Sequence, residues 1–326
     1  MKHRVLVTGA GGFIGSHMVA CLREAGHFVV ALDNFENGHR AAVRADHVLE
    51  CGVESRSVVA AALAVHRIDA VMHFAGYIQV EESIRDPARY YANNFGNTIA
   101  LLHAMVDAGV RRFVFSSSAA VYGTPAINPV TEANGCTPIN AYGRSKLLVE
   151  QSLPDFEHTQ RLKSICLRYF NAAGAKSDAS LGEQHNPETH LIPLAIAAAL
   201  TSGPQLTIFG SDYDTPDGCC VRDYVHVEDI CDGHLLALNH LAEGAASTIL
   251  NLGSGRGHSV REVMDTVARV TGRPVPHTFA SRRPGDPSSL VADISRAERL
   301  LGWTPTRSNL ERIVGDAARW HCRIPK

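Results

Sequence analysis

The sequence predicts an α/β protein built on a doubly wound parallel sheet, with a smaller C-terminal α/β domain. Short β-branched runs alternate with longer helical patterns in the first half of the chain, as in successive βαβ units. A glycine-rich turn directly follows the first of these runs. The alternation breaks after Asn171, where residues 172–189 are rich in Gly, Ser, Asn and Ala. We therefore expect one domain over residues 1–171 and a second, interleaved with it, over 172–326.

Five segments are predicted to be strands of the parallel sheet: residues 4–8, 28–33, 70–74, 112–116 and 164–168. Apolar residues recur between the first two at the spacing of one helix face, which supports the first crossover. Residues 87–108 and 142–157 also have helical patterns, whereas the three prolines in 123–140 predict a loop. A strand and turn near 221–230 are predicted to return beside the sheet, so the two domains are expected to interleave.

The composition excludes several functional classes. Of 326 residues, 45% are hydrophobic and 20% are charged, as in an ordinary globular protein. The formal charge is −2 and the basic residues form no stripe, so neither nucleic acid nor a membrane is an expected partner. The first apolar run is broken by glycines after three residues, too early for a signal peptide or membrane span. The eight cysteines lack a C-x-x-C spacing and are expected to be reduced thiols in the cytoplasm.

The glycine-rich turn has the position and spacing of a dinucleotide-binding motif. Gly9 permits the tight turn, Gly12 lets backbone N–H groups approach a pyrophosphate, and Gly15 allows close helix–sheet packing. Asp33 ends the second predicted strand, where a carboxylate can bind the ribose hydroxyls. That carboxylate would repel a 2′-phosphate, and no Arg follows it in residues 34–38, which favours NAD over NADP. The sequence thus predicts a Rossmann-type domain that binds NAD.

A catalytic group is predicted at the end of the fourth strand. Tyr142 and Lys146 lie four residues apart, on one face of a predicted helix. Bringing a phenol from pKa ~10 to neutrality needs about 4 kcal/mol. One positive charge at ~4 Å supplies about that much at an effective dielectric of ~20, so Lys146, helped by a nicotinamide ring, is expected to suffice. Ser118 follows the strand at its carboxyl end, although each motif alone would also fit a surface helix or a polar turn.

Together, the T-G-x-x-G-x-x-G turn, Ser118 and the Tyr142/Lys146 pair resemble the extended short-chain dehydrogenase/reductase family, over essentially the whole chain. Further segments are similar to the UDP-glucose 4-epimerases of that family: residues 33–34, 73–76, 93–94, 116–123, 167–171, 218–226 and 282–286. The resemblance implies an isomerase that interconverts UDP-glucose and UDP-galactose with NAD, by oxidation at C4, rotation of the 4-keto sugar and re-reduction. It also implies a homodimer formed through helices 87–108 and 142–157.

The resemblance also implies roles for individual residues. Beyond the three glycines, the implied NAD contacts are Phe13, Ile14, Asp33, Asn34, Phe35, Glu36, Asn37, Gly38, Gly52, Val53, Phe74, Ala75, Gly76, Ile78, Asn94, Ser116, Ser118, Tyr142, Lys146 and Phe170. The implied UDP-sugar contacts are Ser118, Tyr142, Tyr169, Asn171, Leu191, Phe209, Arg222, Arg283 and Asp286. Guanidinium groups suit a diphosphate and a carboxylate suits ribose hydroxyls, in agreement with the last three.

The chain departs from the family pattern at two cofactor positions. Where the family usually has Gly-Asp near adenine, this chain has Cys51-Gly52, which removes the carboxylate that would bind the adenine amino group. NAD affinity is then lower unless another residue takes its place. Ile78 stands where many members have Lys, which removes a second cofactor contact.

Three other functions compete with 4-epimerisation of UDP-glucose. Dehydratase or decarboxylase chemistry needs an acid and a base beside Ser118, and the chain has Ala119 and Ala120 there. Epimerisation of a UDP-N-acetylhexosamine or UDP-pentose stays open, because Leu290, at the position that gates sugar bulk, has an intermediate size. A non-catalytic dinucleotide-sensing protein is disfavoured by the retained Tyr/Lys pair.

No metal is expected from the sequence. His185 and His190 lie five residues apart in a predicted loop, and no carboxylate or cysteine cluster completes a metal site.

Overall fold

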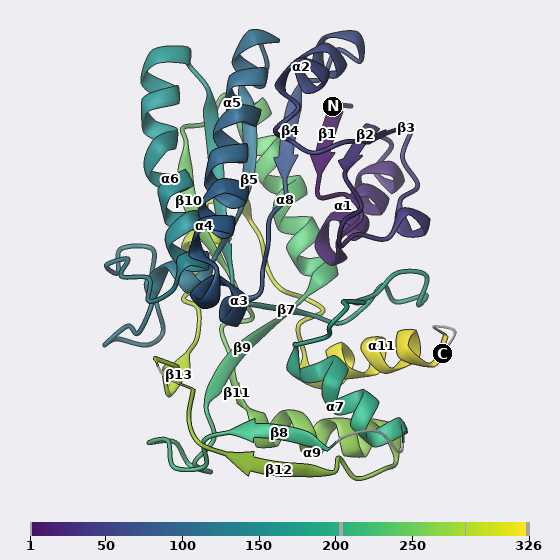
Figure 1. Ribbon diagram of the computed structural model, residues 1–326, viewed down its shortest axis with the longest axis vertical. Coiled ribbons are helices and arrows are strands. Elements are labelled where there is room, and N and C mark those ends of the chain that lie inside the picture. The colour runs from purple at the N-terminus through teal and green to yellow at the C-terminus, as the bar shows by residue number, and fades with distance from the viewer. Residues whose placement is uncertain (1, 202–204, 284, 324–326) are drawn as a thin grey trace.

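Seven parallel strands form the central sheet, in the order β10-β6-β5-β4-β1-β2-β3 (Figure 1). The computed structural model describes residues 2–201, 205–283 and 285–323. The seven strands are β1 (Arg4–Thr8), β2 (Phe28–Asp33), β3 (His47–Glu50), β4 (Ala70–His73), β5 (Arg112–Ser118), β6 (Lys163–Tyr169) and β10 (Thr248–Leu252). The chain leaves β1 in one direction along the sheet and returns to β4 on its other side. Open α/β sheets bind ligands at such a switch point, outside the carboxyl ends of the strands.

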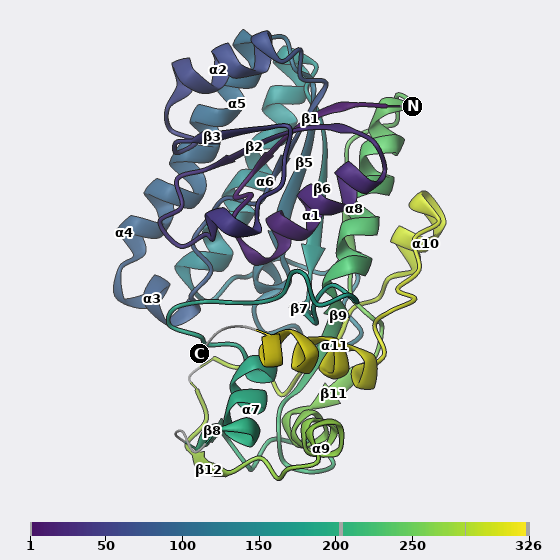
Figure 2. The same cartoon turned by 90° about the vertical axis from the view of Figure 1, so that its right-hand side faces the viewer.

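Helices cover both faces of this sheet (Figure 2). On one face, α1 (Phe13–Glu24) and α8 (Val227–Ala242) pack on alternate strand residues such as Val5 and Val7. On the other face, the residues between them, such as Leu6, pack on α2 (Arg56–Val65), α5 (Asn97–Asp107) and α6 (Ala141–Gln160). Because side chains alternate along a strand, the continuous apolar runs of the sequence bury both faces. The predicted doubly wound architecture is confirmed.

The predicted helix over 87–108 is not one α-helix. It consists of α4 (Pro87–Tyr90), a π-helical segment (Tyr91–Gly96) and α5. The side chain of Asn94, in the π-helical segment, is buried and binds the backbone of a neighbouring turn. A helix widened at this point presents that side chain inward, and π-bulges of this kind are frequent at functional sites.

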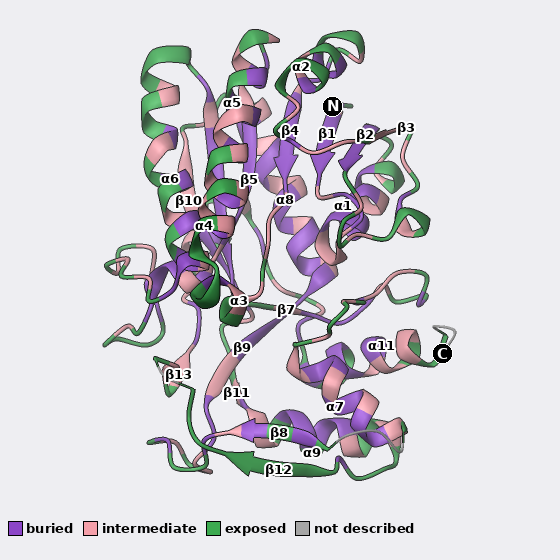
Figure 3. Cartoon of the chain, viewed as in Figure 1, coloured by how far each residue is buried: buried purple, intermediate pink, exposed green. Residues whose placement is uncertain are grey.

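A second core lies below the carboxyl ends of the central strands. The short strands β7 (Asn171–Ala173), β9 (Val221–His226), β11 (Gly257–Ser259) and β13 (Ser289–Leu290) form one sheet, and β8 (Leu206–Phe209) pairs with β12 (His277–Ala280). Three helices pack on this part: α7 (Leu191–Leu200), α9 (Val260–Thr271) and α11 (Leu310–Arg323). Figure 3 shows the contrast between the buried central strands and the exposed strand β12.

The chain returns to the large sheet after the predicted segment near 221–230, and the returning part is longer than predicted. Strand β9 pairs with strands of the small sheet, whereas α8 and β10, over residues 227–252, complete the large one. The return is stabilised by the apolar face of α8, including Ile230 and Leu238, which packs on the large sheet.

The remaining helices are short: η1 (Arg40–Ala42), α3 (Val80–Arg85), η3 (Ala119–Tyr122) and α10 (Ser295–Leu301). Within the described residues, no helix is both long and apolar enough to cross a bilayer.

Candidate active site

The turn between β1 and α1 is shaped by direct backbone packing. Gly9 has φ +66°, and a Cβ there would lie 2.5 Å from the Ala75 nitrogen. A Cβ on Gly15 would lie 2.0 Å from the Gly9 oxygen. Gly12 caps α1 without a side-chain hydrogen bond, so the first N–H groups of the helix keep no side-chain partner there. An uncapped helix N-terminus with an open glycine approach fits a pyrophosphate.

Asp33 joins this turn to the next one. Its Oδ2 accepts the Gly11 N–H at 2.8 Å and its Oδ1 accepts the Phe35 N–H at 2.7 Å. The carboxylate is therefore fixed at the carboxyl end of β2, where it fits a ribose diol. The nearby Arg89 is already paired with Glu36 and Glu82, at 2.9 and 2.6 Å, so its charge is not free to attract a 2′-phosphate.

Asn94 fastens the turn that follows β4. Its Oδ1 accepts the Tyr77 N–H at 2.8 Å, and its Nδ2 donates to the Tyr77 carbonyl at 2.9 Å and to Ser145 at 3.3 Å. The amide thus links the 74–78 turn to α6. Ile78, in the same turn, is 41% exposed and offers no charge in place of the lysine of other members.

Gly52 has no carboxylate, but the carboxylate of Glu54 lies over it. A Cβ on Gly52 would lie 2.1 and 2.2 Å from the two carboxylate oxygens of Glu54. The Glu54 side chain therefore folds back over Gly52, into the space where a residue-52 side chain would begin. This substitution could not be read from the sequence, because it depends on the direction of one side chain.

The predicted catalytic residues come together at the end of β5. Ser118 ends that strand, and Tyr142 and Lys146 lie in the first turns of α6, whose Asn140 cap accepts the Gly143 N–H at 2.8 Å. Burial raises the pKa of Tyr142, and the Ser118 side chain partly opposes this rise. Burial lowers the pKa of Lys146 to about 8.

Lys146 is anchored to strand β5 beside Tyr142. Its Nζ donates to the Ser116 carbonyl at 2.9 Å and lies 6.0 Å from the centre of the Tyr142 ring. Because burial raises the pKa of Tyr142, bringing this phenol to neutrality costs more than the roughly 4 kcal/mol of a free phenol. One lysine charge at ~4 Å supplies only about 4 kcal/mol at an effective dielectric of ~20. A second positive charge is therefore needed to offset the cost of burial.

The predicted substrate residues converge on strand β9 and the segment after β12. Arg222 donates to Asp286 at 2.5 Å, and the Arg283 guanidinium lies 4.0 Å from the centre of the Phe209 ring. Leu290 is paired with Arg222 in the sheet register, and Asn171 with Tyr224. Arg283 also reaches Glu81 of the large domain at 3.3 Å. Leu191 begins α7, is half-buried and packs against the apolar core of the small domain.

Tyr169 lies at the end of β6, close to Ser116 and Tyr142. Its ring is in the core beside α8, and its hydroxyl lies 3.1 Å from His234 Nε2. The alternation along β6 turns this side chain to the face of the sheet that α8 covers. Phe170, the next residue, is also buried, and its N–H donates to the Leu252 carbonyl at 3.1 Å.

Two carboxylates meet the histidines of the predicted loop. Glu183 and Glu188 lie beside His185 and His190, so the expectation that no carboxylate completes this pair is wrong. The four residues are unevenly spaced in a loop. Their side chains meet because the backbone turns, and no sequence periodicity predicts such a turn.

Comparisons with known proteins bear on the whole chain. A sequence model described as the NAD dependent epimerase/dehydratase family matches residues 5–253. A UDP-glucose 4-epimerase of Azospirillum brasilense is 48% identical over 97% of this chain and 91% of its own. The crystal structure of UDP-glucose 4-epimerase from Brucella ovis in complex with NAD has a TM-score of 0.95 and 44% identity, covering 97% of this chain and 98% of that one.

A second similar structure contains a nucleotide sugar. It is UDP-glucose-4-epimerase from Stenotrophomonas maltophila with bound NAD and formylated UDP-arabinopyranose, with a TM-score of 0.95 and 41% identity over 98% of both chains. These likenesses extend over both the cofactor part and the substrate part of the chain.

Proposed function

Because the chain belongs to the NAD dependent epimerase/dehydratase family, we propose that it is an isomerase that interconverts UDP-glucose and UDP-galactose with NAD. The observation that carries this proposal is the grouping of Ser118, Tyr142 and Lys146 at the carboxyl edge of a sheet whose first turn fits a dinucleotide. It is supported by relatives of that name along nearly the full length of the chain.

The residues that hold NAD in this proposal follow the edge of the sheet from β2 to β5. The N-terminus of α1 takes the pyrophosphate through the N–H groups that follow Gly12, and Asp33 takes the adenosine ribose. The turn fastened by Asn94 lies along the cofactor, and Ser116 and Phe170 lie beside its nicotinamide end. The chemistry that NAD supplies when bound is the reversible oxidation of the sugar carbon C4.

Glu54 is proposed to replace the adenine contact that Gly52 cannot make. Its carboxylate already occupies the space over Gly52, next to the buried Val53. A carboxylate there can accept a hydrogen bond from an exocyclic amino group. The loss of the family carboxylate is then compensated two residues further along the chain.

Tyr142 is proposed to act as the base on the sugar 4-hydroxyl. Its phenolate accepts the hydroxyl proton while C4 is oxidised, and the phenol returns a proton when C4 is reduced. Ser118 donates to the same sugar oxygen, and Lys146 stabilises the phenolate through its charge. Proton transfer by a placed side chain accelerates such steps by about 10²–10⁴.

The substrate is proposed to be held by its nucleotide, leaving the sugar free to turn. Arg222 and Arg283 bind the diphosphate, Asp286 binds the uridine ribose and Phe209 lies against the base, with Asn171 and Leu191 at the sugar end. A 4-keto sugar has to present both faces in turn, so tight binding belongs on the part that does not react.

The direct test is to incubate the purified enzyme with UDP-glucose and to analyse the product. UDP-galactose should form until the two sugars are in equilibrium, with no net consumption of NAD. Absence of interconversion by an NAD-loaded, folded enzyme would remove the proposal.

Epimerisation of a UDP-pentose or UDP-N-acetylhexosamine is the second candidate. Leu290 stands in register with Arg222, beside the proposed diphosphate site, where its size would limit the sugar. A comparison of turnover on UDP-glucose, UDP-N-acetylglucosamine and UDP-arabinopyranose separates these activities.

A cytoplasmic homodimer with two interleaved domains, 1–171 and 172–326, completes the proposal. The outer side of α6 carries an apolar hollow of about 430 Å³ between Leu148 and Tyr91, next to the π-helical segment. A second copy packed on α5 and α6 would cover it. Light scattering should give twice the chain mass, and a monomer would contradict the homodimer alone.

A further inference from the structure

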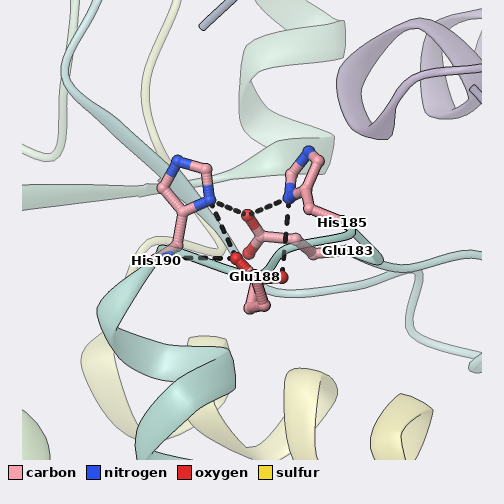
Figure 4. A group of neighbouring side chains, drawn as sticks. All are labelled: Glu183, His185, Glu188 and His190. Carbon is pink, nitrogen blue, oxygen red and sulfur yellow. Dashed lines mark hydrogen bonds and ion pairs between the residues drawn. The ribbon is translucent and has the colours of Figure 1, made fainter. Parts of the chain in front are cut away.

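The loop between β7 and α7 gathers two imidazoles and two carboxylates around one point (Figure 4). His185 Nδ1 lies 3.4 Å from Glu183 Oε1 and 3.5 Å from Glu188 Oε2. His190 Nδ1 lies 2.8 Å from Glu183 Oε1 and 3.2 Å from Glu188 Oε1. One atom from each residue lies within 4.8 Å of the others. Both histidines thus present the same ring nitrogen to the same two carboxylates.

These separations match the edges of a small metal polyhedron. Nitrogen and oxygen ligands at about 2.0–2.2 Å from tetrahedral zinc are roughly 3.3–3.5 Å apart. Two of the four distances have that length and two are shorter, at 2.8 and 3.2 Å, whereas ligand atoms that are 4.8 Å apart would have to approach by about 1 Å. His185 Nδ1 is buried and makes no hydrogen bond among the described residues. It therefore points at the carboxylates from a distance that suits a shared ion.

The charge of the cluster needs a compensating cation. Glu183 is buried, with a side chain 5% exposed, and within the described residues no lysine or arginine pairs with it or with Glu188. A buried carboxylate without a cation is costly. Two protonated imidazoles or one divalent ion between neutral imidazoles would restore neutrality equally well.

The two ways of neutralising the cluster compete. An ion and a proton bind the same imidazole nitrogen, so binding of an ion to a protonated histidine releases that proton. The other titratable groups facing the loop are His321 of α11, His17 of α1 and His39, whose Nε2 lies 3.0 Å from the Gln184 carbonyl.

We propose that Glu183, His185, Glu188 and His190 bind one divalent transition-metal ion, for which zinc is the best match. Two imidazole nitrogens and two carboxylate oxygens suit zinc, whereas magnesium and calcium prefer oxygen ligands alone. The His190 side chain is 43% exposed, which leaves a path for the ion. Thr189 and His190 donate their N–H groups to Glu188 Oε1 at 2.8 and 2.9 Å, which orients that ligand from outside.

The four residues lie between the two domains, where an ion would have a structural role. The Trp320 indole of α11 donates to the Glu183 carbonyl at 3.0 Å, and His39 of the cofactor part contacts the Gln184 carbonyl. His190 is the N-cap position of α7. An ion here would fix the segment 183–190 to the start of α7 and against both neighbours.

Metal content decides the proposal. The untagged, NAD-loaded enzyme is stripped with a chelator, titrated with Zn²⁺, and with Co²⁺ followed by visible absorption, and then analysed for bound metal. We expect one ion per chain, the intense absorption of four-coordinate Co²⁺, proton release and a higher Tm. Glu183→Gln and His185→Gln should lose the ion, whereas the matched control His258→Gln, at a surface His–Glu pair, should keep it.

Three results would overturn the proposal: no stoichiometric ion in the wild type, an ion that both variants retain, or an ion that His258→Gln also loses. If the variants fail to fold, anomalous scattering at the zinc edge from wild-type crystals locates the ion directly. A peak away from the four residues, or no peak, contradicts the proposal. Epimerase activity is not a readout here, so failure of one proposal is distinguishable from failure of the other.

Discussion

The cofactor side and the substrate side of the candidate site are built in opposite ways. On the cofactor side, the functional groups are already bonded to one another: Asp33 to two backbone N–H groups, Asn94 to Tyr77, and Lys146 to Ser116. On the substrate side, Arg222 binds Asp286, but the Arg283 side chain is 48% exposed and rests on Phe209. The first arrangement is ready for its ligand, whereas the second can still adapt.

This difference suits a reaction that keeps its cofactor and turns its substrate. A site whose polar groups are fixed in advance loses little freedom on binding, so a dinucleotide can be held through many turnovers. On the substrate side, a largely buried Arg222 in a short strand and an exposed Arg283 in a loop can hold a diphosphate without fixing the sugar. Amino-acid substitutions on each side test whether the two sides have these separate roles.

The largest effect is expected from Tyr142→Phe, because it removes the proposed base and leaves both binding sides intact. Turnover should fall by about 10²–10⁴. The amount of bound NAD and the affinity for UDP should stay as in the wild type. Product formation from UDP-glucose measures the loss, and Tyr91→Phe, another half-buried tyrosine outside the reacting group, is the control.

If Tyr142→Phe turns over at the wild-type rate, Tyr142 is not the catalytic base, and the cofactor side and the substrate side would serve for binding alone. The chain would then be closer to a dinucleotide-sensing protein.

A smaller effect is expected from Arg222→Gln, on the substrate side alone. The change removes a charged donor for the diphosphate and leaves Asp286 without its partner. Charge-assisted hydrogen bonds contribute about 1.5–3 kcal/mol, so KM should rise by roughly 10–100-fold, with kcat nearly unchanged. Steady-state kinetics with UDP-glucose separate the two constants. Arg299→Gln is a surface control, and a loss of bound NAD in Arg222→Gln would contradict the division into two sides.

The smallest effect is expected from Glu54→Ala, on the cofactor side, because it removes the acceptor proposed for the adenine amino group. An exposed hydrogen bond contributes about 0.5–1.5 kcal/mol, so the Kd for NAD should rise by roughly 3–10-fold. Equilibrium binding of NAD to stripped enzyme measures it, with Glu50→Ala at the end of β3 as the matched control. An unchanged Kd would show that the carboxylate over Gly52 does not bind adenine.

The parts that could be predicted from sequence are those with a local physical signature. Strands β1 and β2 have the predicted bounds, because apolar runs ending in Gly9 and Asp33 mark them at both ends. The interruption of the helix over 87–108 has no such signature. The helix widens so that Asn94 can bind the turn containing Tyr77, a partner distant in sequence.

The rest depends on contacts between distant segments. The bond between Lys146 and the Ser116 carbonyl joins positions thirty residues apart, which no local pattern predicts. Glu54 was missed because its role depends on one rotamer. The carboxylates beside His185 were missed because a loop has no period from which convergence could be inferred.

The central claim is that the cofactor side ionises Tyr142 only when a positively charged ring adds to the field of Lys146. The most direct measurement is the pKa of Tyr142 from phenolate absorption, taken as the difference between wild type and Tyr142→Phe. In stripped enzyme it should lie above the ordinary value of about 10, because burial raises it. In enzyme loaded with NAD⁺ it should fall to near neutrality, and Lys146→Met should raise it again. An equal pKa in the stripped and loaded states would contradict the account.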